Sequence, residues 1–378
     1  MFCDMFDDQF LKKNQKEKTM DKFINFSNAE KRRYARHFSL ADVGEQGQLL
    51  LKQAKVLCIG AGGLGSPLLL YLAAAGVGEI GICDFDEVSE SNLQRQILFS
   101  EKDIGKSKAK KAKERLMDLN PHLKYNVYDE KLTSENALSI FENYDIIADG
   151  SDNFPTRYLV NDACLLTRKP CVFGAVSRFE GQVSVFNLKR KNGTFGPNYR
   201  DIFPEPPAPG TVLNCAEAGV LGVLPGIIGS MQANEVIKII TGIGEPLDGR
   251  LFLFDAAEFS SRTLKIRKNP TIKVEKLIDY DFFCGLKVPE ISHQQLSEMR
   301  KAEENFQLID VREKEEYERE NIGGDLMPLS EFEQYFSKLS KRNKIVIHCQ
   351  SGKRSAVAVK KLQELGFENV YSLKGGIG

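Results

Sequence analysis

The chain has 378 residues, of which 42% are hydrophobic and 28% are charged, and its 52 Lys and Arg residues balance 52 Asp and Glu residues. This length favours two domains over one, and the balanced charge does not indicate a nucleic acid or an anionic membrane as a partner. No apolar run approaches the roughly 18 residues of a membrane-spanning helix, so we expect no membrane partner.

Residues 1–24 predict a charged, poorly ordered tail. Acidic residues in MFCDMFDDQFLKKNQKEKTM occupy the place where a secretory signal needs a basic start and an apolar stretch, and Met20 offers an alternative start. We therefore expect a cytoplasmic protein, in which most of the eight cysteines remain free thiols.

Residues 25–270 predict an α/β domain with a Rossmann-like, doubly wound sheet. Apolar strand-like runs alternate with helix-like segments, beginning with the strand KVLCIG, a helix through LGSPLLLYLAAAG and the strand EIGICDFD. From GQVSVFNLK onward, antiparallel strands surround a proline-rich loop. The helix IGSMQANEVIKIIT and the strands RLFLFDA and TLKIRK complete the domain.

The segment KVLCIGAGGLGSP predicts a glycine loop that opens a helix, where backbone N–H groups can approach a phosphate. The glycines of this loop are Gly60, Gly62, Gly63 and Gly65. The loop alone does not distinguish NAD(P), FAD and ATP, because all of them present phosphate. Asp84, at the end of the next strand, and Asp86 are candidates to hold a ribose, which both NAD and ATP contain.

Three further sites offer the cationic and metal-binding groups that a triphosphate needs. They are SNLQRQ with Asn92, Arg95 and Gln96, GKSKAKK with Lys108, and ADGSDN with Asp152 and Asn153. Arginine and lysine can hold phosphates, and an aspartate oxygen suits Mg²⁺. Each residue also has an ordinary interpretation, since Lys108 can be a solvated helix position and Asp152 and Asn153 can cap a helix. Their combination behind a glycine loop favours ATP.

Roughly residues 28 to 270 resemble the MoeB/ThiF branch of the ubiquitin-activating-enzyme superfamily. The resemblance rests on RYARH, GAGGLGSP, AAAGVGEI, DFDEVSESNLQRQ, DGSDN, EGQVSVF and NCAEAGVLGVLPGIIGSMQANEVIK. It implies ATP-dependent adenylation of the C-terminal Gly-Gly carboxylate of a small ubiquitin-like sulfur carrier of the MoaD/ThiS type. The implied roles are ribose binding by Asp84, phosphate binding by Asn92, Arg95 and Lys108, Mg²⁺ binding by Asp152, and a contribution of Arg36 to the other subunit's site in a homodimer. Arg95, Lys108 and Asp152 are therefore the expected catalytic residues.

The sequence departs from this family at one site. Relatives in this branch carry two C-x-x-C pairs that bind a structural zinc, whereas Asn198 and Asp201 stand where the first pair would fall and the second region is shortened. We therefore expect no zinc and a 190–215 loop held by packing. Cys215 stands where relatives carry a cysteine proposed to form a thioester or persulfide link, and it is either such a residue or a packed thiol.

Residues 271–290 predict a linker, and residues 291–378 predict a smaller α/β domain that resembles a single-domain rhodanese. The strand KIVIHC, the loop CQSGKRS and the helix AVAVKKLQELG place Cys349 at a helix N-terminus, near Lys353 and Arg354. Backbone N–H groups and these cations would stabilise a thiolate and a persulfide anion. A tyrosine phosphatase is the alternative, but the spacing from Cys349 to Arg354 is one residue too short for its motif.

Two other features of this domain bear on the prediction. Asp310 and Arg312 of IDVRE are expected to be structural anchors or part of the pocket rim. Rhodaneses usually continue beyond a segment such as LKGGIG, so the domain is expected to be incomplete at its C-terminus.

The two resemblances together imply activation followed by sulfur transfer. Cys349 would deliver persulfide sulfur, supplied by a donor such as a cysteine desulfurase, to the adenylated carrier, and Cys215 would help to resolve the intermediate. The thiocarboxylate would serve molybdopterin, thiazole or a related pathway. The alternatives are an NAD-dependent oxidoreductase, a non-catalytic scaffold that docks carriers, and an activating enzyme for tRNA thiolation or protein conjugation.

Overall fold

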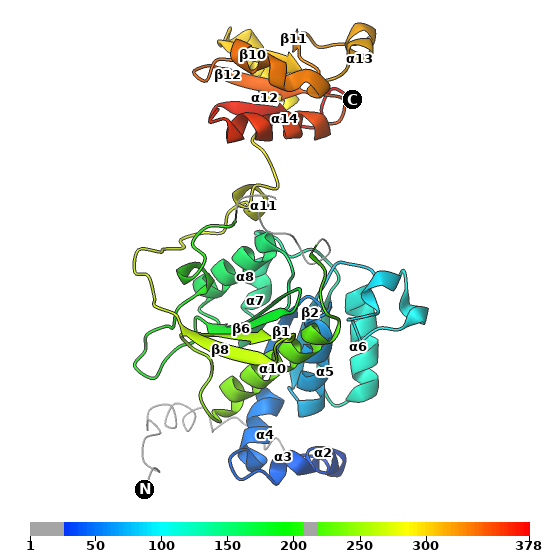
Figure 1. The fold of residues 1–378 in the computed structure, drawn as a ribbon. Helices are drawn as coiled ribbons and strands as arrows, with labels where there is room; N and C mark the ends of the chain where they lie inside the picture. The colour runs from blue at the N-terminus through cyan, green and yellow to red at the C-terminus, as the bar shows by residue number, and fades with distance from the viewer. Residues whose placement is uncertain (1–25, 208–217) are drawn as a thin grey trace. The chain divides into compact units, whose positions relative to one another are not determined.

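The computed structural model describes residues 26–207 and 218–378, which form two compact units (Figure 1). The first unit extends to Leu277, and the second begins at Ile278. Within the described residues, no helix is both long enough and apolar enough to cross a membrane.

The first unit is built on an eight-stranded sheet with the order β3-β2-β1-β4-β5-β6-β7-β8. Its strands are β1 (Lys55–Ile59), β2 (Glu79–Cys83), β3 (Lys124–Tyr128), β4 (Ile146–Asp149), β5 (Cys171–Ser177), β6 (Glu180–Phe186), β7 (Arg250–Asp255) and β8 (Ser260–Lys265). The strands from β3 to β5 are parallel, and β6, β7 and β8 continue the sheet in antiparallel fashion. This confirms the predicted doubly wound sheet with its antiparallel extension.

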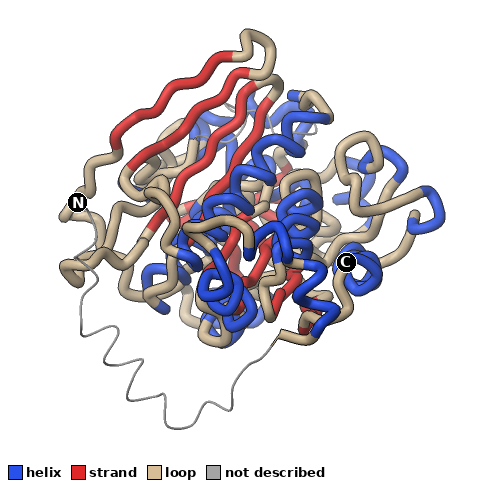
Figure 2. Tube along the Cα trace, turned by 90° about the horizontal axis from the view of Figure 1, so that it is seen from below, coloured by secondary structure: helices blue, strands red, loops and turns tan. Residues whose placement is uncertain are grey.

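The described helices of this unit are α2 (Asn28–Arg33), α3 (Ala35–Phe38), α4 (Gly44–Gln53), α5 (Gly65–Ala75), α6 (Lys108–Leu119), α7 (Ala137–Phe141), α8 (Phe154–Thr167) and α10 (Val223–Thr241). Of these, α5, α6, α8 and α10 pack against strands of the sheet, and Figure 2 shows helices in blue and strands in red. Short 3₁₀ turns are η1 (Glu90–Asn92), η2 (Glu101–Asp103) and η3 (Tyr199–Asp201). Helix α10 begins five residues before the predicted Ile228, because Pro225 in the first turn of a helix costs no hydrogen bond.

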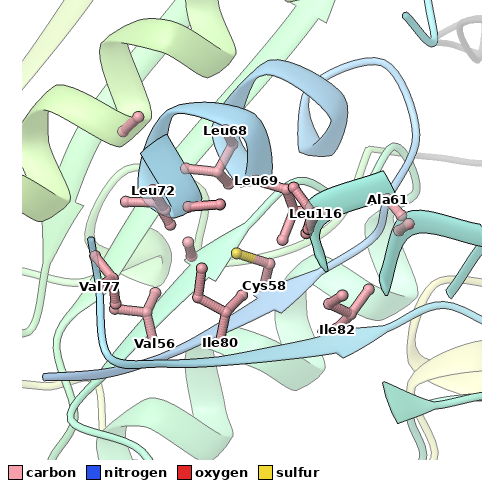
Figure 3. Close-up of a cluster of buried hydrophobic side chains, with 14 of the residues drawn as sticks. Val56, Cys58, Ala61, Leu68, Leu69, Leu72, Val77, Ile80, Ile82 and Leu116 are labelled. Carbon is pink, nitrogen blue, oxygen red and sulfur yellow. The ribbon is translucent and has the colours of Figure 1, made fainter. Parts of the chain in front are cut away.

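The core of this unit lies between the parallel strands and α5. Val56 and Cys58 of β1 and Ile80 of β2 are fully buried against α5, where Leu68 and Leu72 face them (Figure 3). Strands that are buried on both faces read as continuous apolar runs, which is why the sequence predicted them well. This packing fixes the carboxyl ends of β1, β2 and β4 beside the first turn of α5.

The second unit contains a five-stranded parallel sheet with the order β11-β10-β12-β13-β9. Its strands are β9 (Glu290–Ile291), β10 (Phe306–Asp310), β11 (Asp325–Leu326), β12 (Lys344–His348) and β13 (Val370–Leu373). Its helices are α11 (Tyr280–Phe283), α12 (His293–Lys301), α13 (Lys314–Arg319), the 3₁₀ segment η4 (Leu329–Lys338) and α14 (Lys353–Glu364).

The segment expected to be a linker is partly structured. It contains α11, and Tyr280 and Cys284 are buried, while the two residues of β9 pair with β13 in the second sheet. Short apolar stretches such as YDFF carry too little periodicity to be distinguished from a linker in the sequence.

Candidate functional site

A cavity of about 300 Å³ lies in the first unit where β1, β2 and β4 end. Ligand sites in open α/β sheets form at this edge. Most of the predicted nucleotide-binding residues line it, namely Gly60, Gly62, Gly63, Asp84, Asp86, Arg95, Gln96, Lys108, Asp152 and Asn153. The fold therefore brings together residues that are up to 93 positions apart in sequence, from Gly60 to Asn153.

The glycine loop has little room for side chains. Gly60 has φ +85°, a conformation that favours glycine, and a Cβ on Gly65 would overlap the carbonyl oxygen of Gly60. A Cβ on Gly62 would lie 3.4 Å from Nε2 of Gln96. Gly65 does not line the cavity but starts α5, whose N-terminus provides a partial positive charge for an anion.

Asp84 is fixed at the end of β2 by two backbone donors. Its Oδ2 accepts from the N–H of Ala61 at 2.7 Å, and its Oδ1 accepts from the N–H of Asp86 at 2.9 Å. Burial raises the pKa of Asp84, and the two hydrogen bonds oppose this shift. The carboxylate is thus held rigidly at the cavity wall, where its remaining lone pairs can accept from ribose hydroxyls.

Lys108 opens α6 with its ammonium at the cavity. Its Nζ lies 2.9 Å from Oδ2 of Asp86, and its backbone N–H donates to the carbonyl oxygen of Asp86 at 2.9 Å. The lysine is buried, so the ordinary interpretation of a solvated helix position is wrong for it. A phosphate that enters the cavity would share this ammonium with Asp86.

Arg95 and Asp152 face the cavity with their charges largely uncommitted. Arg95 Nη1 donates to the carbonyl oxygen of Ser91 at 3.0 Å. The Asp152 carboxylate is exposed and has no hydrogen-bond or ion-pair partner among residues 26–207 and 218–378. A single free carboxylate is compatible with Mg²⁺, because this ion keeps several waters and is also bound by substrate phosphates. The described residues contain no cluster of three or more side chains that could hold a metal ion by themselves.

Some predicted site residues do not line the cavity. The Asn92 side chain accepts from the N–H of Ser89 at 3.3 Å and caps η1. Arg36 lies exposed on α3, and Cys215 falls outside the described residues. Asn153 lines the cavity and also caps α8, because its Oδ1 accepts from the N–H of Thr156 at 3.0 Å.

The structure adds two residues, Ser151 and Arg157, that sequence reasoning missed. Buried polar atoms without a partner in the described part of the chain include Ser151 Oγ, Arg157 Nε and Oε1 of Gln96, and all three residues line the cavity. The Arg157 guanidinium lies over the rings of Phe154 and Phe173, at 5.8 and 5.7 Å. The only feature of the sequence that could have indicated Arg157 is its position one helical turn after Asn153, the residue that caps α8. Unsatisfied buried donors and acceptors at a cavity wall indicate a polar ligand.

Hydrogen bonds link the residues around Asn198 and Asp201, where the family resemblance would place a zinc site. Asp201 Oδ2 accepts from the N–H and Nδ2 of Asn198 at 2.7 and 2.8 Å, and its Oδ1 accepts from the N–H of Asn269 at 2.8 Å. Arg200 donates to both oxygens of Asp162 at 2.8 Å. The described part of this loop is therefore linked by directed polar contacts, whereas the sequence predicted packing alone, and residues 208–215 of the loop lie outside the described residues.

In the second unit, Cys349 follows β12 and lies at the N-terminus of α14, as predicted. Its sulfur accepts from the N–H of Ser355 at 3.4 Å. Burial raises the pKa of the thiol, but hydrogen bonds from Ser355 and from the N–H groups of Ser351 and Arg354 outweigh it, so the pKa lies below the ordinary value. The loop is built to hold a thiolate.

Arg354 is paired with a carboxylate of α13. Its Nη1 and Nη2 donate to Oε2 and Oε1 of Glu316, both at 2.6 Å. Arg312 makes a similar fork with Asp310, and its Nη1 donates to Oε1 of Gln350 in the loop at 3.3 Å. Asp310 and Arg312 are both buried, so they anchor the loop as the sequence predicts.

The fork between Arg354 and Glu316 makes the second unit sensitive to acid. The hydrogen bonds from Arg354 lower the pKa of Glu316 from 4.5 to about 2. A depressed carboxylate pKa stabilises the fold above the unfolded-state pKa, and this contribution is lost as the pH falls from 4.5 towards 2. We expect Glu316→Gln to lower the unfolding temperature at neutral pH and to flatten its acid dependence. Calorimetry from pH 7 to 3 measures this, and Glu315→Gln, an exposed neighbour, is expected to behave as wild type.

Comparison with known proteins gives two family matches. The profile of the ThiF family matches residues 34–274, and that of the rhodanese-like domain matches residues 292–378. "Probable adenylyltransferase/sulfurtransferase MoeZ" of Mycobacterium tuberculosis is 46% identical over 364 residues, 93% of each chain. "Sulfur carrier protein adenylyltransferase" of Thermus thermophilus is 51% identical over 271 residues, 70% of this chain and 100% of that protein.

Solved structures support the fold of the first unit. A crystal structure of E. coli MccB with MccA-N7isoASN has a TM-score of 0.57 at 21% identity, over 72% of this chain and 83% of that one. The structure of PaaA has a TM-score of 0.54 at 23% identity, over 71% and 84%. At these identities the likeness concerns the fold alone.

Proposed function

Since the chain belongs to the ThiF family and is an adenylyltransferase and sulfurtransferase, we propose that it activates the C-terminal Gly-Gly carboxylate of a ubiquitin-like sulfur carrier protein. The single observation that carries the proposal is the cavity, which gathers a glycine loop, the cations Arg95 and Lys108 among others, and the free carboxylate of Asp152. The name of the T. thermophilus relative supports a sulfur carrier as substrate.

In the first step, the carrier's carboxylate attacks the α-phosphorus of ATP, and pyrophosphate leaves. The nucleophile is already ionised, so no side-chain base is needed. Catalysis then consists of in-line positioning and charge neutralisation. Arg95 and Lys108 would bind phosphate oxygens, the glycine loop would donate N–H groups, and Asp84 would hold the ribose.

Asp152 would hold Mg²⁺ together with phosphate oxygens, and the metal would supply further neutralisation of the phosphate charge. Gln96, Ser151 and Arg157 have buried polar atoms without partners in the described residues and would contact the nucleotide or the carrier tail. In a homodimer, Arg36 would reach the site of the other subunit, and the reaction would take place in the cytoplasm.

In the second step, the persulfide on Cys349 would attack the adenylated carboxyl group and displace AMP, which gives an acyl disulfide. A second thiol, for which we propose Cys215, would attack the sulfur of Cys349, form a disulfide with it and release the thiocarboxylate. A cysteine desulfurase would supply the persulfide, and the product would serve molybdopterin, thiazole or related biosynthesis.

The test is ATP–pyrophosphate exchange by the full chain with a panel of Gly-Gly-ended carriers. We expect exchange with at least one carrier and its loss when the last glycine of that carrier is removed. The carrier that supports exchange would also indicate the pathway, including tRNA thiolation or protein conjugation. ATP binding without exchange for any carrier would overturn adenylation and favour a docking scaffold.

A further inference from the structure

Two buried serine hydroxyls lie behind the sulfur of Cys349, and the reaction proposed above does not use them. Oγ of Ser355, in the first turn of α14, is 3.6 Å from Cys349 Sγ and 2.8 Å from Oγ of Ser372 on β13. Cys349 is 1% exposed, and both serines are 0% exposed. Bulk water therefore cannot replace these hydroxyls as hydrogen-bond donors to the sulfur.

The Ser355 hydroxyl has one proton and three acceptors within reach. They are the carbonyl oxygen of Gly352 at 3.0 Å, the Ser372 hydroxyl and the sulfur of Cys349. A thiolate accepts more strongly than a neutral oxygen. When the sulfur is ionised, Ser355 can therefore donate to it while accepting from Ser372. When the sulfur is neutral, Ser355 can donate to Gly352 instead.

We propose that Ser355, supported by Ser372, is a positioning residue that stabilises negative charge on Cys349 Sγ during sulfur transfer. This inference rests on the proposed role of Cys349. In loading, the Cys349 thiolate attacks the outer sulfur of a donor persulfide, and the donor thiolate leaves. In discharge to a simple acceptor, cyanide takes the outer sulfur as thiocyanate, and the Cys349 thiolate leaves. Sγ carries charge in both steps, and the two hydroxyls form a chain that strengthens with that charge.

The test is the pH dependence of iodoacetamide alkylation at Cys349 in the full chain, followed by mass spectrometry of the peptide that contains it. We expect Ser355→Ala to raise the pH midpoint by about one unit and Ser372→Ala to raise it by less. Ser351→Ala is the matched control, because Ser351 acts on the sulfur through its backbone N–H and its side chain is exposed. This control should keep the wild-type midpoint.

A midpoint that is unchanged in both Ser355→Ala and Ser372→Ala would overturn the inference, and a fall in unfolding temperature alone would indicate a structural role. If Ser355→Ala fails to fold, the Ser372→Ala midpoint decides, because that change leaves the N–H of Ser355 on the sulfur. Alkylation needs neither ATP nor carrier. Loss of thiocarboxylate formation with an intact pH shift would therefore count against the proposed function and not against the role of Ser355.

Discussion

Asp152→Ala is expected to lower carrier-dependent ATP–pyrophosphate exchange at least 100-fold, a loss of about 3 kcal/mol of transition-state stabilisation. The carboxylate lines the cavity at the end of β4 and has no partner among the described residues, so its removal leaves no broken contact in the fold. Its loss would leave the phosphate charges of ATP without the metal that we place at Asp152.

The matched control is Asp118→Ala, which removes an exposed carboxylate from α6, away from the cavity lining. Both variants should unfold at the wild-type temperature, and the control should retain exchange. Near-normal exchange by Asp152→Ala at limiting Mg²⁺ would contradict the proposed role of Asp152 in binding the metal. A lowered unfolding temperature would instead indicate that the carboxylate stabilises the start of α8.

The sequence predicted those parts of the site that local pattern determines. Gly60 adopts a positive φ, and a Cβ on Gly65 would overlap a carbonyl oxygen. Both positions therefore need glycine, and the two glycines can be recognised in the sequence. Asp84 follows directly after an apolar strand, and Asp152 lies three residues beyond the end of another, and the carboxyl ends of these strands meet at one sheet edge. A strand followed by a polar residue is therefore enough to place these carboxylates.

Other features depend on contacts between segments, which no local pattern reveals. Lys108 is buried with its ammonium paired to Asp86, which lies 22 residues earlier in the chain. The Nε of Arg157 is buried without a hydrogen-bond partner in the described residues, and this can be seen only in the folded structure. The same holds for Arg354, which the sequence placed near Cys349. Its guanidinium is paired with Glu316, a residue that no sequence pattern singles out. Side-chain pairing across elements is set by the fold and not by spacing.

Cys349→Ser is expected to lower the rate of thiocarboxylate formation at least about 100-fold. Carrier-dependent ATP–pyrophosphate exchange should stay at the wild-type level. Adenylation needs no sulfur, whereas transfer needs a thiolate that can carry a persulfide. The other described cysteines offer poor substitutes, since burial raises the pKa of Cys58 well above its ordinary value and that of Cys83 to about 12. Mass spectrometry of the carrier after incubation with ATP and a persulfide donor measures the product.

Asp152→Ala provides the reciprocal control for this variant, because it should accept sulfur on Cys349 although it does not adenylate. If the two activities separate in this way, mixing the two variants tests whether one chain can sulfurate a carrier that another has activated. Thiocarboxylate formation by Cys349→Ser at the wild-type rate would mean that sulfide attacks the adenylate directly or that another cysteine carries the persulfide. Loss of exchange in Cys349→Ser would mean that Cys349 is needed for activation itself, which would contradict the proposed division between adenylation and sulfur transfer.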